Sequence, residues 1–239
     1  FYALPPYRVG KEEVITMEDM AKYHIRVMQE HMPHGPYLLG GYCIGATVAM
    51  EVVRQLIEKG EKVEQLLLID PPPCIYWLGW VWPVYDKVGD MLSWDLQKKI
   101  HHFDLTAISF ARWLSKPIGS KFTSIFRRLG LISSMSSSPT TPGRTSSEGD
   151  GEILKSLDYA IYFLAYRIYH PESLSVASTV YFPEDTISSH LSWVKRDSKK
   201  ALINCSIEMV PGDHQTCITK YTLDLGKKMK EALDHLYKK

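Results

Sequence analysis

The 239-residue sequence lacks a long apolar segment and lacks an excess of charge of either sign. Its apolar stretches, such as Leu66–Ile69 and Ala160–Ala165, are far shorter than the ~20 residues that span a bilayer, and no secretory signal pattern opens the chain. Lys and Arg total 28 against 27 for Asp and Glu. We therefore expect a soluble, cytoplasmic protein with no membrane anchor and no broad cationic surface for nucleic acid.

Cysteine is also scarce, and no C-x-x-C pair is present. The four cysteines are Cys43, Cys74, Cys205 and Cys217. This spacing indicates neither a zinc knuckle nor a disulfide framework, so a reducing compartment is expected. The adjacent His101 and His102 would point apart on a helix and do not indicate a metal site. With 45% hydrophobic residues, the chain is long enough to form one domain with a buried core.

Short segments of strand character alternate with segments of helical character along the chain. Thr16 followed by Asp19 resembles a helix-start capping arrangement. Apolar residues recur at helical spacing between Ala49 and Leu56, and again towards the C-terminus. The predicted strands are Phe1–Leu4, Tyr37–Leu39, Val63–Ile69, Val176–Phe182 and Ile207–Val210. Strands that alternate with helices predict an α/β fold with a parallel sheet.

The segment at about 74–169 interrupts this regular alternation. It has helical character, is rich in Trp and Tyr, and contains the tract Ser133–Gly151, which is dominated by Ser, Thr, Pro and Gly. It is too long for an ordinary connection between a strand and a helix. We predict one domain over residues 1–239 with a helical lid inserted at about 74–169. Tyrosines at 159, 162, 166 and 169 line one helix face, for which packing is expected rather than ligand stacking.

The segment Gly41–Gly45 reads G-x-C-x-G and lies between a predicted strand and a predicted helix. In that context G-x-S-x-G forms a nucleophile turn, and here cysteine replaces the serine. We expect a Cβ at Gly41 or at Gly45 to collide with the neighbouring strand or helix. The helix N-terminus would favour the thiolate of Cys43, and the Ile44 N–H would be placed to hold an oxyanion.

Such a nucleophile needs a base and a carboxylate that orients the base. Asp70 follows the Val63–Ile69 strand, at the sheet edge where Cys43 is displayed, because the carboxyl ends of parallel strands lie together. His214 follows the last predicted strand and completes the chain order nucleophile, acid, histidine. Asp185 or Glu184, after the Val176–Phe182 strand, remains an alternative acid.

At these motifs the chain resembles the C-terminal thioesterase domains of nonribosomal peptide synthetases and polyketide synthases, within the α/β-hydrolase family. Gly35–Leu56 is similar to the strand, turn and helix of that family, Leu66–Asp70 to its acid-bearing strand, and Pro211–His214 to its histidine loop. The resemblance implies a mostly parallel sheet with helices on both faces and a lid that shapes an acyl pocket.

The resemblance also implies roles for individual residues. Cys43 would be the nucleophile, His214 the base and Asp70 its orienting acid. The chain departs from the family pattern in two ways: serine is usual where Cys43 stands, and members carry a longer segment before the strand predicted at Phe1–Leu4. We therefore expect an N-terminally truncated domain in which the Ile44 N–H is the remaining oxyanion donor, and loss of one donor lowers the rate by about 100- to 1000-fold.

The resemblance implies a thioesterase that takes an acyl or peptidyl chain from the phosphopantetheine thioester of a carrier protein and releases it by hydrolysis or cyclisation. Phosphopantetheine belongs to the carrier, so we expect no cofactor of the enzyme itself. A stand-alone editing thioesterase that clears stalled carriers remains an alternative, as does an inactive domain that binds acyl chains or a carrier. Lys121, Arg127 and Arg128 are interpreted as a solvated helix face rather than a carrier or phosphate site.

Overall fold

The computed structural model of the protein describes residues 2–5, 7, 14–72, 78–114, 157–185 and 200–237, with the backbone alone at 78, 107–114, 157–159 and 235–237. Cys74, the tract Ser133–Gly151 and the basic residues Lys121, Arg127 and Arg128 lie outside the described residues.

The chain divides into two compact units. One consists of Phe1–Gly79 together with Ala165–Lys239, and the other consists of Trp80–Leu164. The lid that the sequence predicts at about 74–169 stays a prediction, both in its boundaries and in its role.

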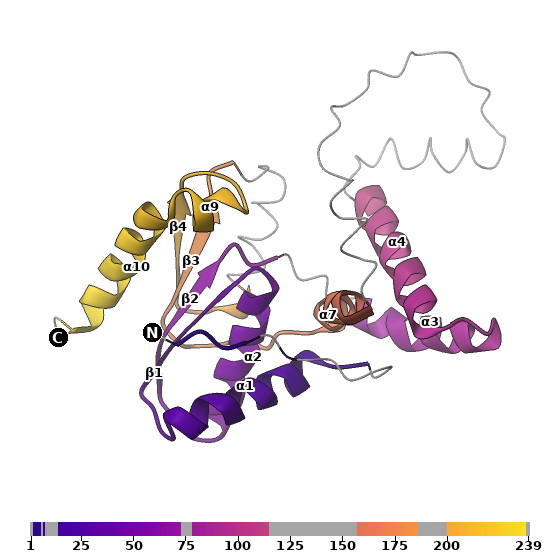
Figure 1. The fold of residues 1–239 in the computed structure, drawn as a ribbon, viewed down its shortest axis with the longest axis horizontal. Helices are drawn as coiled ribbons and strands as arrows, with labels where there is room; N and C mark the ends of the chain where they lie inside the picture. The colour runs from indigo at the N-terminus through magenta and orange to yellow at the C-terminus, as the bar shows by residue number, and fades with distance from the viewer. Residues whose placement is uncertain are drawn as a thin grey trace, which may run out of the picture. The chain divides into compact units, whose positions relative to one another are not determined.

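A parallel sheet forms the centre of the first unit (Figure 1). Its strands are β1 (Tyr37–Tyr42), β2 (Val63–Ile69), β3 (Ser178–Pro183) and β4 (Cys205–Val210), and they lie in the order β1-β2-β3-β4. The predicted α/β class with a parallel sheet is therefore confirmed. The strand predicted at Phe1–Leu4 is wrong for its described residues, since Tyr2–Leu4 lie in no strand. Pro5 and Pro6 follow Leu4, and proline lacks the backbone N–H that a β-ladder needs. The apolar run therefore ends after four residues, which is short for a strand.

The first unit contains four described helices. They are α1 (Met17–His31), α2 (Ile44–Glu58), α9 (Thr216–Thr219) and α10 (Thr222–Tyr237). The predicted capping arrangement at the start of α1 is confirmed, because the Thr16 hydroxyl accepts a hydrogen bond from the Asp19 N–H at 3.2 Å. No described helix has the combination of length and apolar character that a membrane span requires.

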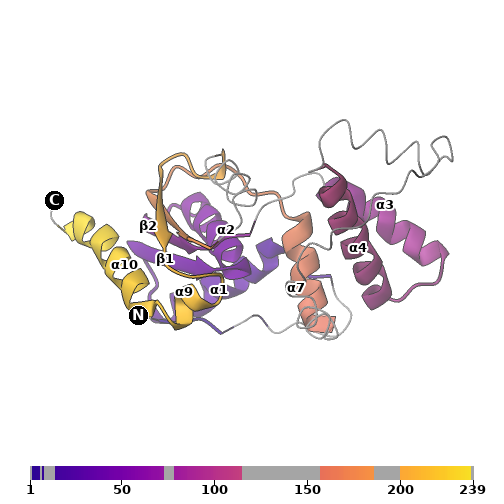
Figure 2. The same cartoon turned by 90° about the horizontal axis from the view of Figure 1, so that it is seen from above.

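Apolar side chains cover both faces of the sheet. On one face, α2 residues such as Ala46 and Val53 pack on Leu66, Leu68 and their neighbours in β3. On the other face, residues of α9 and α10 pack with Leu67, Tyr181 and Val210. Figure 2 shows these helices on opposite sides of the strands. Helices on both faces, which the resemblance implied, are therefore present.

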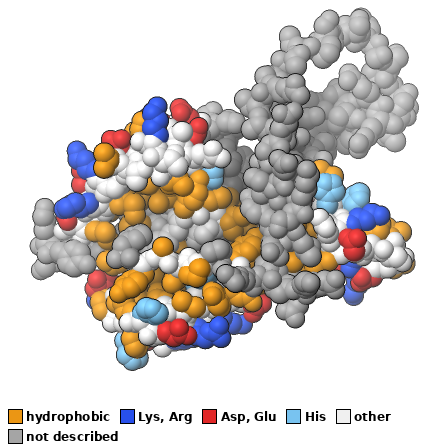
Figure 3. All heavy atoms as spheres, viewed as in Figure 1, with side chains coloured by type: hydrophobic (Ala, Val, Ile, Leu, Met, Phe, Trp, Pro, Cys, Tyr) orange, Lys and Arg blue, Asp and Glu red, His pale blue; other side chains and the backbone are white. Residues whose placement is uncertain are grey.

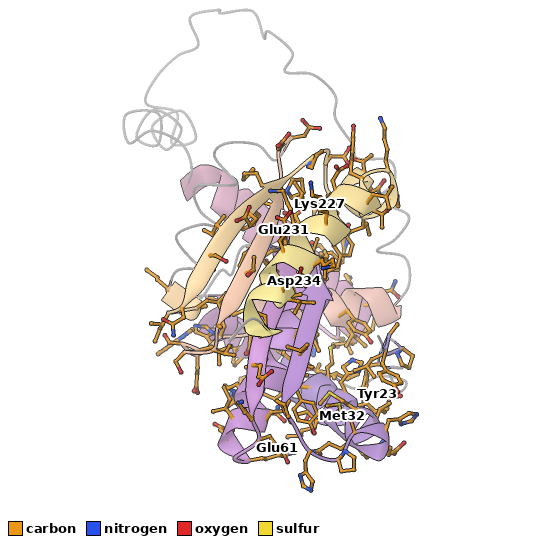
Figure 4. The ribbon with its side chains drawn as sticks, turned by 90° about the vertical axis from the view of Figure 1, so that its left-hand side faces the viewer. Tyr23, Met32, Glu61, Lys227, Glu231 and Asp234 are labelled. Carbon is orange, nitrogen blue, oxygen red and sulfur yellow. The ribbon has the colours of Figure 1, made fainter. Side chains whose placement is uncertain are left out.

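The closing helix α10 is amphipathic. Leu225 is buried, and Met229 and Leu233 pack against the same apolar cluster. Lys227 and Glu231 are exposed on its outer side (Figure 4). The helical spacing of the apolar residues therefore buries one face of α10 on the sheet, as the sequence predicts.

β1 is the terminal strand of the described sheet, and its hydrogen-bonded neighbour there is β2. Leu38 on this strand is 40% exposed, whereas Tyr37 is buried. Hydrophobic side chains are visible over much of the face of this unit that Figure 3 presents.

The second unit has an aromatic core of its own. It contains α3 (Leu78–Met91) from Trp80 onward, α4 (Leu96–Leu114) and the first part of α7 (Leu157–Ile168). Trp82 and Phe103 are buried, and their rings meet edge to face with centroids 5.0 Å apart. The Lys99 ammonium group donates hydrogen bonds to Asp86 and Asp90 of α3 at 2.8 and 2.5 Å. The aromatic contact and the two ion pairs join α3 to α4.

Candidate active site

Cys43 stands at the sharp turn between β1 and α2. Its backbone has φ 54° and ψ −127°, a conformation that residues with a side chain rarely adopt. The turn is held on both sides: the Cys43 N–H donates to the Ile69 carbonyl at 3.0 Å, and the Cys43 carbonyl accepts from the Ala46 N–H at 2.9 Å. A strained residue between a strand and a helix is the geometry of a nucleophile turn.

The two glycines of the G-x-C-x-G motif differ in what surrounds them. A Cβ at Gly41 would overlap the Gly45 carbonyl and would lie 2.7 Å from the Ala46 Cα, so the predicted collision is confirmed there. The same prediction is wrong for Gly45, where a Cβ would meet nothing within 4 Å. Gly45 lies in the first turn of α2 and faces outward, so space does not require glycine at that position.

Ile44 is the first residue of α2. Its N–H therefore has no acceptor within the helix. The Cys43 N–H is already bonded to β2, and the first turn of α2 carries no acidic residue that would offset the positive end of the helix dipole. Of these two N–H groups, that of Ile44 is the candidate oxyanion donor, as the sequence predicts.

Asp70 and His214 meet at the carboxyl ends of the strands. Asp70 directly follows β2, and its N–H donates to the Tyr181 carbonyl of β3 at 2.8 Å. The His214 Nδ1 lies 2.6 Å from the Asp70 Oδ2. The Asp70 side chain is 10% exposed and that of His214 is 46% exposed, so the pair has one buried side and one open side.

The pKa of His214 reflects both of its partners. The hydrogen bond to Asp70 is the largest cause that raises the pKa of His214 to about 10, and a side-chain hydrogen bond with Cys43 is the next. Partial burial acts in the opposite direction, while charge attraction to Cys43 and Asp70 adds to the rise. Both partners therefore favour the imidazolium form of His214, and Cys43 as well as Asp70 lies close to the imidazole.

The alternative acids lie at the end of β3, at the same edge of the sheet. Glu184 and Asp185 follow β3, and both are exposed. Their backbone N–H groups donate to the carbonyls of Val210 and Gly212 at 2.8 and 3.1 Å. The carboxylate hydrogen-bonded to the His214 imidazole is that of Asp70.

The histidine loop is held by a reciprocal cap that sequence reasoning missed. The Asp213 carboxylate accepts from the Thr216 N–H at 2.8 Å, and the Thr216 hydroxyl accepts from the Asp213 N–H at 2.7 Å. Gly212 has φ 88°, and a Cβ there would lie 2.5 Å from the Thr216 Oγ1. The signal was available locally, because a D-x-x-T spacing resembles a capping box.

Tyr42 is a second residue that sequence reasoning missed. Its ring stacks on the His214 imidazole with centroids 4.8 Å apart and planes at 24°, and its hydroxyl donates to the His214 carbonyl at 2.6 Å. No local pattern indicates this contact, because 172 residues separate the two in the chain.

The helix that carries the nucleophile turn is anchored by a buried charge network. Glu51 is 1% exposed and accepts two hydrogen bonds from Arg54, each of 2.7 Å. The Tyr169 hydroxyl also donates to Glu51 at 2.7 Å. Tyr166 and Tyr169 are buried, so the packing interpretation of the tyrosine stripe is confirmed at these two positions.

Metal ligation has no site in the part of the chain that the structure describes. There, no group of three or more His, Cys, Asp or Glu side chains is arranged to hold a metal ion. The His101 and His102 rings have centroids 5.9 Å apart and are inclined at 73°, so they do not share a coordination point.

Residues 1–77 match the family model of the thioesterase domain. The chain is 44% identical over 73 residues to the indigoidine synthase of Streptomyces lavendulae, a match that covers 30% of this chain and 6% of that protein. It is 39% identical over 88 residues to a non-reducing polyketide synthase of Aspergillus ustus, with 36% of this chain and 4% of that protein covered. The chain therefore matches only a small fraction of these relatives' length.

The fold has counterparts among solved thioesterase domains. The NocB thioesterase domain from the nocardicin cluster superposes with a TM-score of 0.55 at 18% identity, covering 94% of this chain and 76% of that one. A four-domain nonribosomal peptide synthetase gives 0.56 at 18% identity over 94% of this chain and 16% of that one. The resemblance to synthetase thioesterase domains and the α/β-hydrolase fold are confirmed.

Proposed function

We propose that this chain is a thioesterase domain that releases an acyl or peptidyl chain from the phosphopantetheine thioester of a carrier protein through an acyl-enzyme on Cys43. The observation that carries the proposal is the 2.6 Å contact between the Asp70 Oδ2 and the His214 Nδ1, with Cys43 near enough to the imidazole to raise the pKa of His214. The family match over residues 1–77 supports the thioester substrate class.

The first half of the reaction loads the enzyme. His214 takes the proton of the Cys43 thiol, and the sulfur attacks the thioester carbonyl. Negative charge develops on the carbonyl oxygen beside the Ile44 N–H at the positive end of α2. The intermediate collapses, the bond to the carrier sulfur breaks, and that sulfur receives the proton from His214. The acyl or peptidyl group is now bound to Cys43 as a thioester.

The second half of the reaction frees the chain. His214 removes a proton from water or from a nucleophile within the bound acyl or peptidyl group, and that nucleophile attacks the Cys43 thioester. The carbon–sulfur bond breaks, and His214 returns the proton to the sulfur. Asp70 holds the imidazole in one orientation and stabilises its positive charge in both halves.

A cysteine nucleophile changes the energetics of the intermediate. Exchange of one thioester for another is nearly isoenergetic, so the acyl group on Cys43 keeps its reactivity, whereas a serine ester would be less reactive. We infer that the acceptor is a poor or strained nucleophile, such as an amine or a ring-closing hydroxyl. If Cys43→Ser released the same product at an equal or higher rate, this inference about the acceptor would be wrong.

The test uses the full chain and the octanoyl thioester of N-acetylcysteamine, a small mimic of a pantetheine thioester. We expect release of N-acetylcysteamine by the wild type and loss of that activity in Cys43→Ala and in His214→Ala. The matched control is Cys205→Ala, which removes another partly exposed cysteine at the start of β4 and should retain activity. Turnover that survives Cys43→Ala would refute the proposal, and a chain that binds the thioester without turnover would identify the inactive binding domain.

The preferred length of the acyl group distinguishes an editing thioesterase from a release domain. An editing thioesterase would accept short acyl groups such as acetyl as readily as octanoyl, because it clears stalled carriers of varied content. We expect the release domain proposed here to favour the longer chain. Equal rates for both thioesters would favour the editing role.

A further inference from the structure

Tyr42 contacts the histidine at two points. Its hydroxyl donates to the His214 carbonyl at 2.6 Å, which ties the backbone of the histidine loop to the end of β1. Its ring lies almost parallel to the imidazole, with 4.8 Å between centroids. Since Tyr42 is also the residue before Cys43, one side chain links the nucleophile turn to the loop that carries the histidine.

We propose that Tyr42 is a positioning residue, which fixes the His214 imidazole between Cys43 and Asp70 and stabilises its protonated form with the face of the tyrosine ring. The inference deepens the proposed function and rests on it. Tyr42 touches neither the substrate carbonyl nor the sulfur in this role, and it acts through His214.

The position of Tyr42 is itself well defined. Tyr42 pairs with Ile69 in the register of β1 and β2, so it lies one residue from the position of Asp70 in the neighbouring strand. Its ring packs against the apolar cluster that contains Leu67 and Cys217. The Cys217 thiol also donates to the His214 carbonyl, at 3.3 Å. Two side chains from different elements therefore hold the same carbonyl group.

The tyrosine remains a hydrogen-bond donor while the histidine is charged. Burial is the largest cause that raises the pKa of Tyr42, and the nearby groups Cys43, Cys217, Asp70 and Asp213 raise it further. The phenol thus keeps its proton in the pH range where His214 titrates. The tyrosine face also carries negative charge density, and a cation within about 6 Å of the ring centroid is attracted to it.

The hydroxyl and the ring make separate contributions, which two variants distinguish. Tyr42→Phe removes the bond to the His214 carbonyl and keeps the stacking, and we expect a fall in kcat of about 2- to 10-fold. Tyr42→Leu removes both contacts, and we expect a fall of about 10- to 100-fold. KM should stay unchanged in both, because neither contact binds the thioester.

The chain offers a matched control at the other end of the same strand. The hydroxyl of Tyr37 donates to the Met32 carbonyl at 2.9 Å, so Tyr37→Phe removes the same kind of bond far along β1 from His214. We expect its kcat to stay close to wild type. Thermal unfolding of all three variants shows whether each is folded, and Tyr42→Phe keeps the inference testable should Tyr42→Leu not fold.

Two readouts distinguish positioning from a general structural role. In NMR spectra of histidine-labelled protein, with His214→Ala for assignment, we expect His214 to titrate at lower pH in Tyr42→Leu than in wild type. Alkylation of Cys43 by iodoacetamide at neutral pH should slow in the same order as kcat, and Tyr37→Phe should change neither readout.

The result that overturns the inference is a folded Tyr42→Leu with wild-type kcat, His214 titration and alkylation rate. If Tyr42→Leu behaves like wild type but Cys43→Ala and His214→Ala abolish turnover of the octanoyl thioester, Tyr42 has no positioning role and the proposed function stands. If His214→Ala retains full turnover, the proposed function fails and the role of Tyr42 fails with it.

Discussion

Substitution of the two motif glycines by alanine should have opposite effects on stability. At Gly41 the new methyl group would overlap the Gly45 carbonyl and lie 2.5 Å from the Gly45 carbonyl carbon and 2.7 Å from the Ala46 Cα. All of these are backbone atoms of the first turn of α2, so no side-chain rotation relieves the contact. Overpacking against a core typically costs about 1 to 3 kcal/mol, and we expect Gly41→Ala to lower the free energy of unfolding by about 3 kcal/mol.

Gly45→Ala is the matched substitution in the same motif. The added methyl group meets nothing within 4 Å, and alanine is favoured over glycine in a helix by up to about 1 kcal/mol. Gly45 is near the helix end, where the preference is weaker, so we expect a gain of about 0.5 kcal/mol. The two variants should therefore differ by about 3.5 kcal/mol in the free energy of unfolding.

Urea denaturation of both variants and the wild type measures this difference. With a slope of roughly 1 to 3 kcal/mol per molar urea, Gly41→Ala should move the midpoint down by about 1 to 3 M, and Gly45→Ala should leave it equal or slightly higher. Equal destabilisation by the two substitutions would refute the reasoning, because it would mean that other atoms fill the space beside Gly45 in solution. A Gly41→Ala midpoint equal to wild type would refute it as well.

Further substitutions test the site and its supports. Asp70→Asn should lower the pKa of His214 from about 10 towards its ordinary value of 6.5, as measured by NMR titration. Because the pKa of His214 is raised in the folded state, the stabilisation by this pair is fully present below pH 6.5 and is lost as the pH rises to about 10. Allowing for solvent screening of the half-exposed imidazole, unfolding measured at these two pH values should show a loss of about 1 kcal/mol in wild type and little in Asp70→Asn. Gly212→Ala should lower stability by about 1 to 3 kcal/mol and slow alkylation of Cys43, because a Cβ there meets Thr216. Thr16→Ala should lower the free energy of unfolding by about 1 kcal/mol through loss of the helix cap, with no change in thioester turnover.

Local signals in the sequence account for most of the core sheet and its helices. The strand predicted at Val63–Ile69 has the bounds of β2, because its nearly unbroken apolar run, Leu66–Ile69 above all, fits a strand that is covered on both faces. The helix after Thr16 starts where its capping residues indicate. The meeting of Asp70 with His214 follows from topology, since the carboxyl ends of parallel strands share one edge.

What the sequence does not predict depends on contacts between distant parts of the chain. Tyr42 and His214 are 172 residues apart, and no periodicity links them. The open space at Gly45 depends on how the first turn of α2 faces its surroundings, which the motif alone does not specify. The strand predicted at Phe1–Leu4 shows a different error, because apolar residues suggest a strand there, although Tyr2–Leu4 lie in no strand among the described residues.

The most direct test of the account is the location of the acyl group during turnover. After brief mixing of the full chain with octanoyl-N-acetylcysteamine and an acid quench, peptide mass mapping should find the octanoyl group on Cys43, and on no other residue. His214→Ala should carry far less of it at the same time point. Octanoyl found on another cysteine or on a serine, or the same amount on Cys43 with and without His214, would contradict the claim that Asp70, His214 and Cys43 act together in acyl transfer.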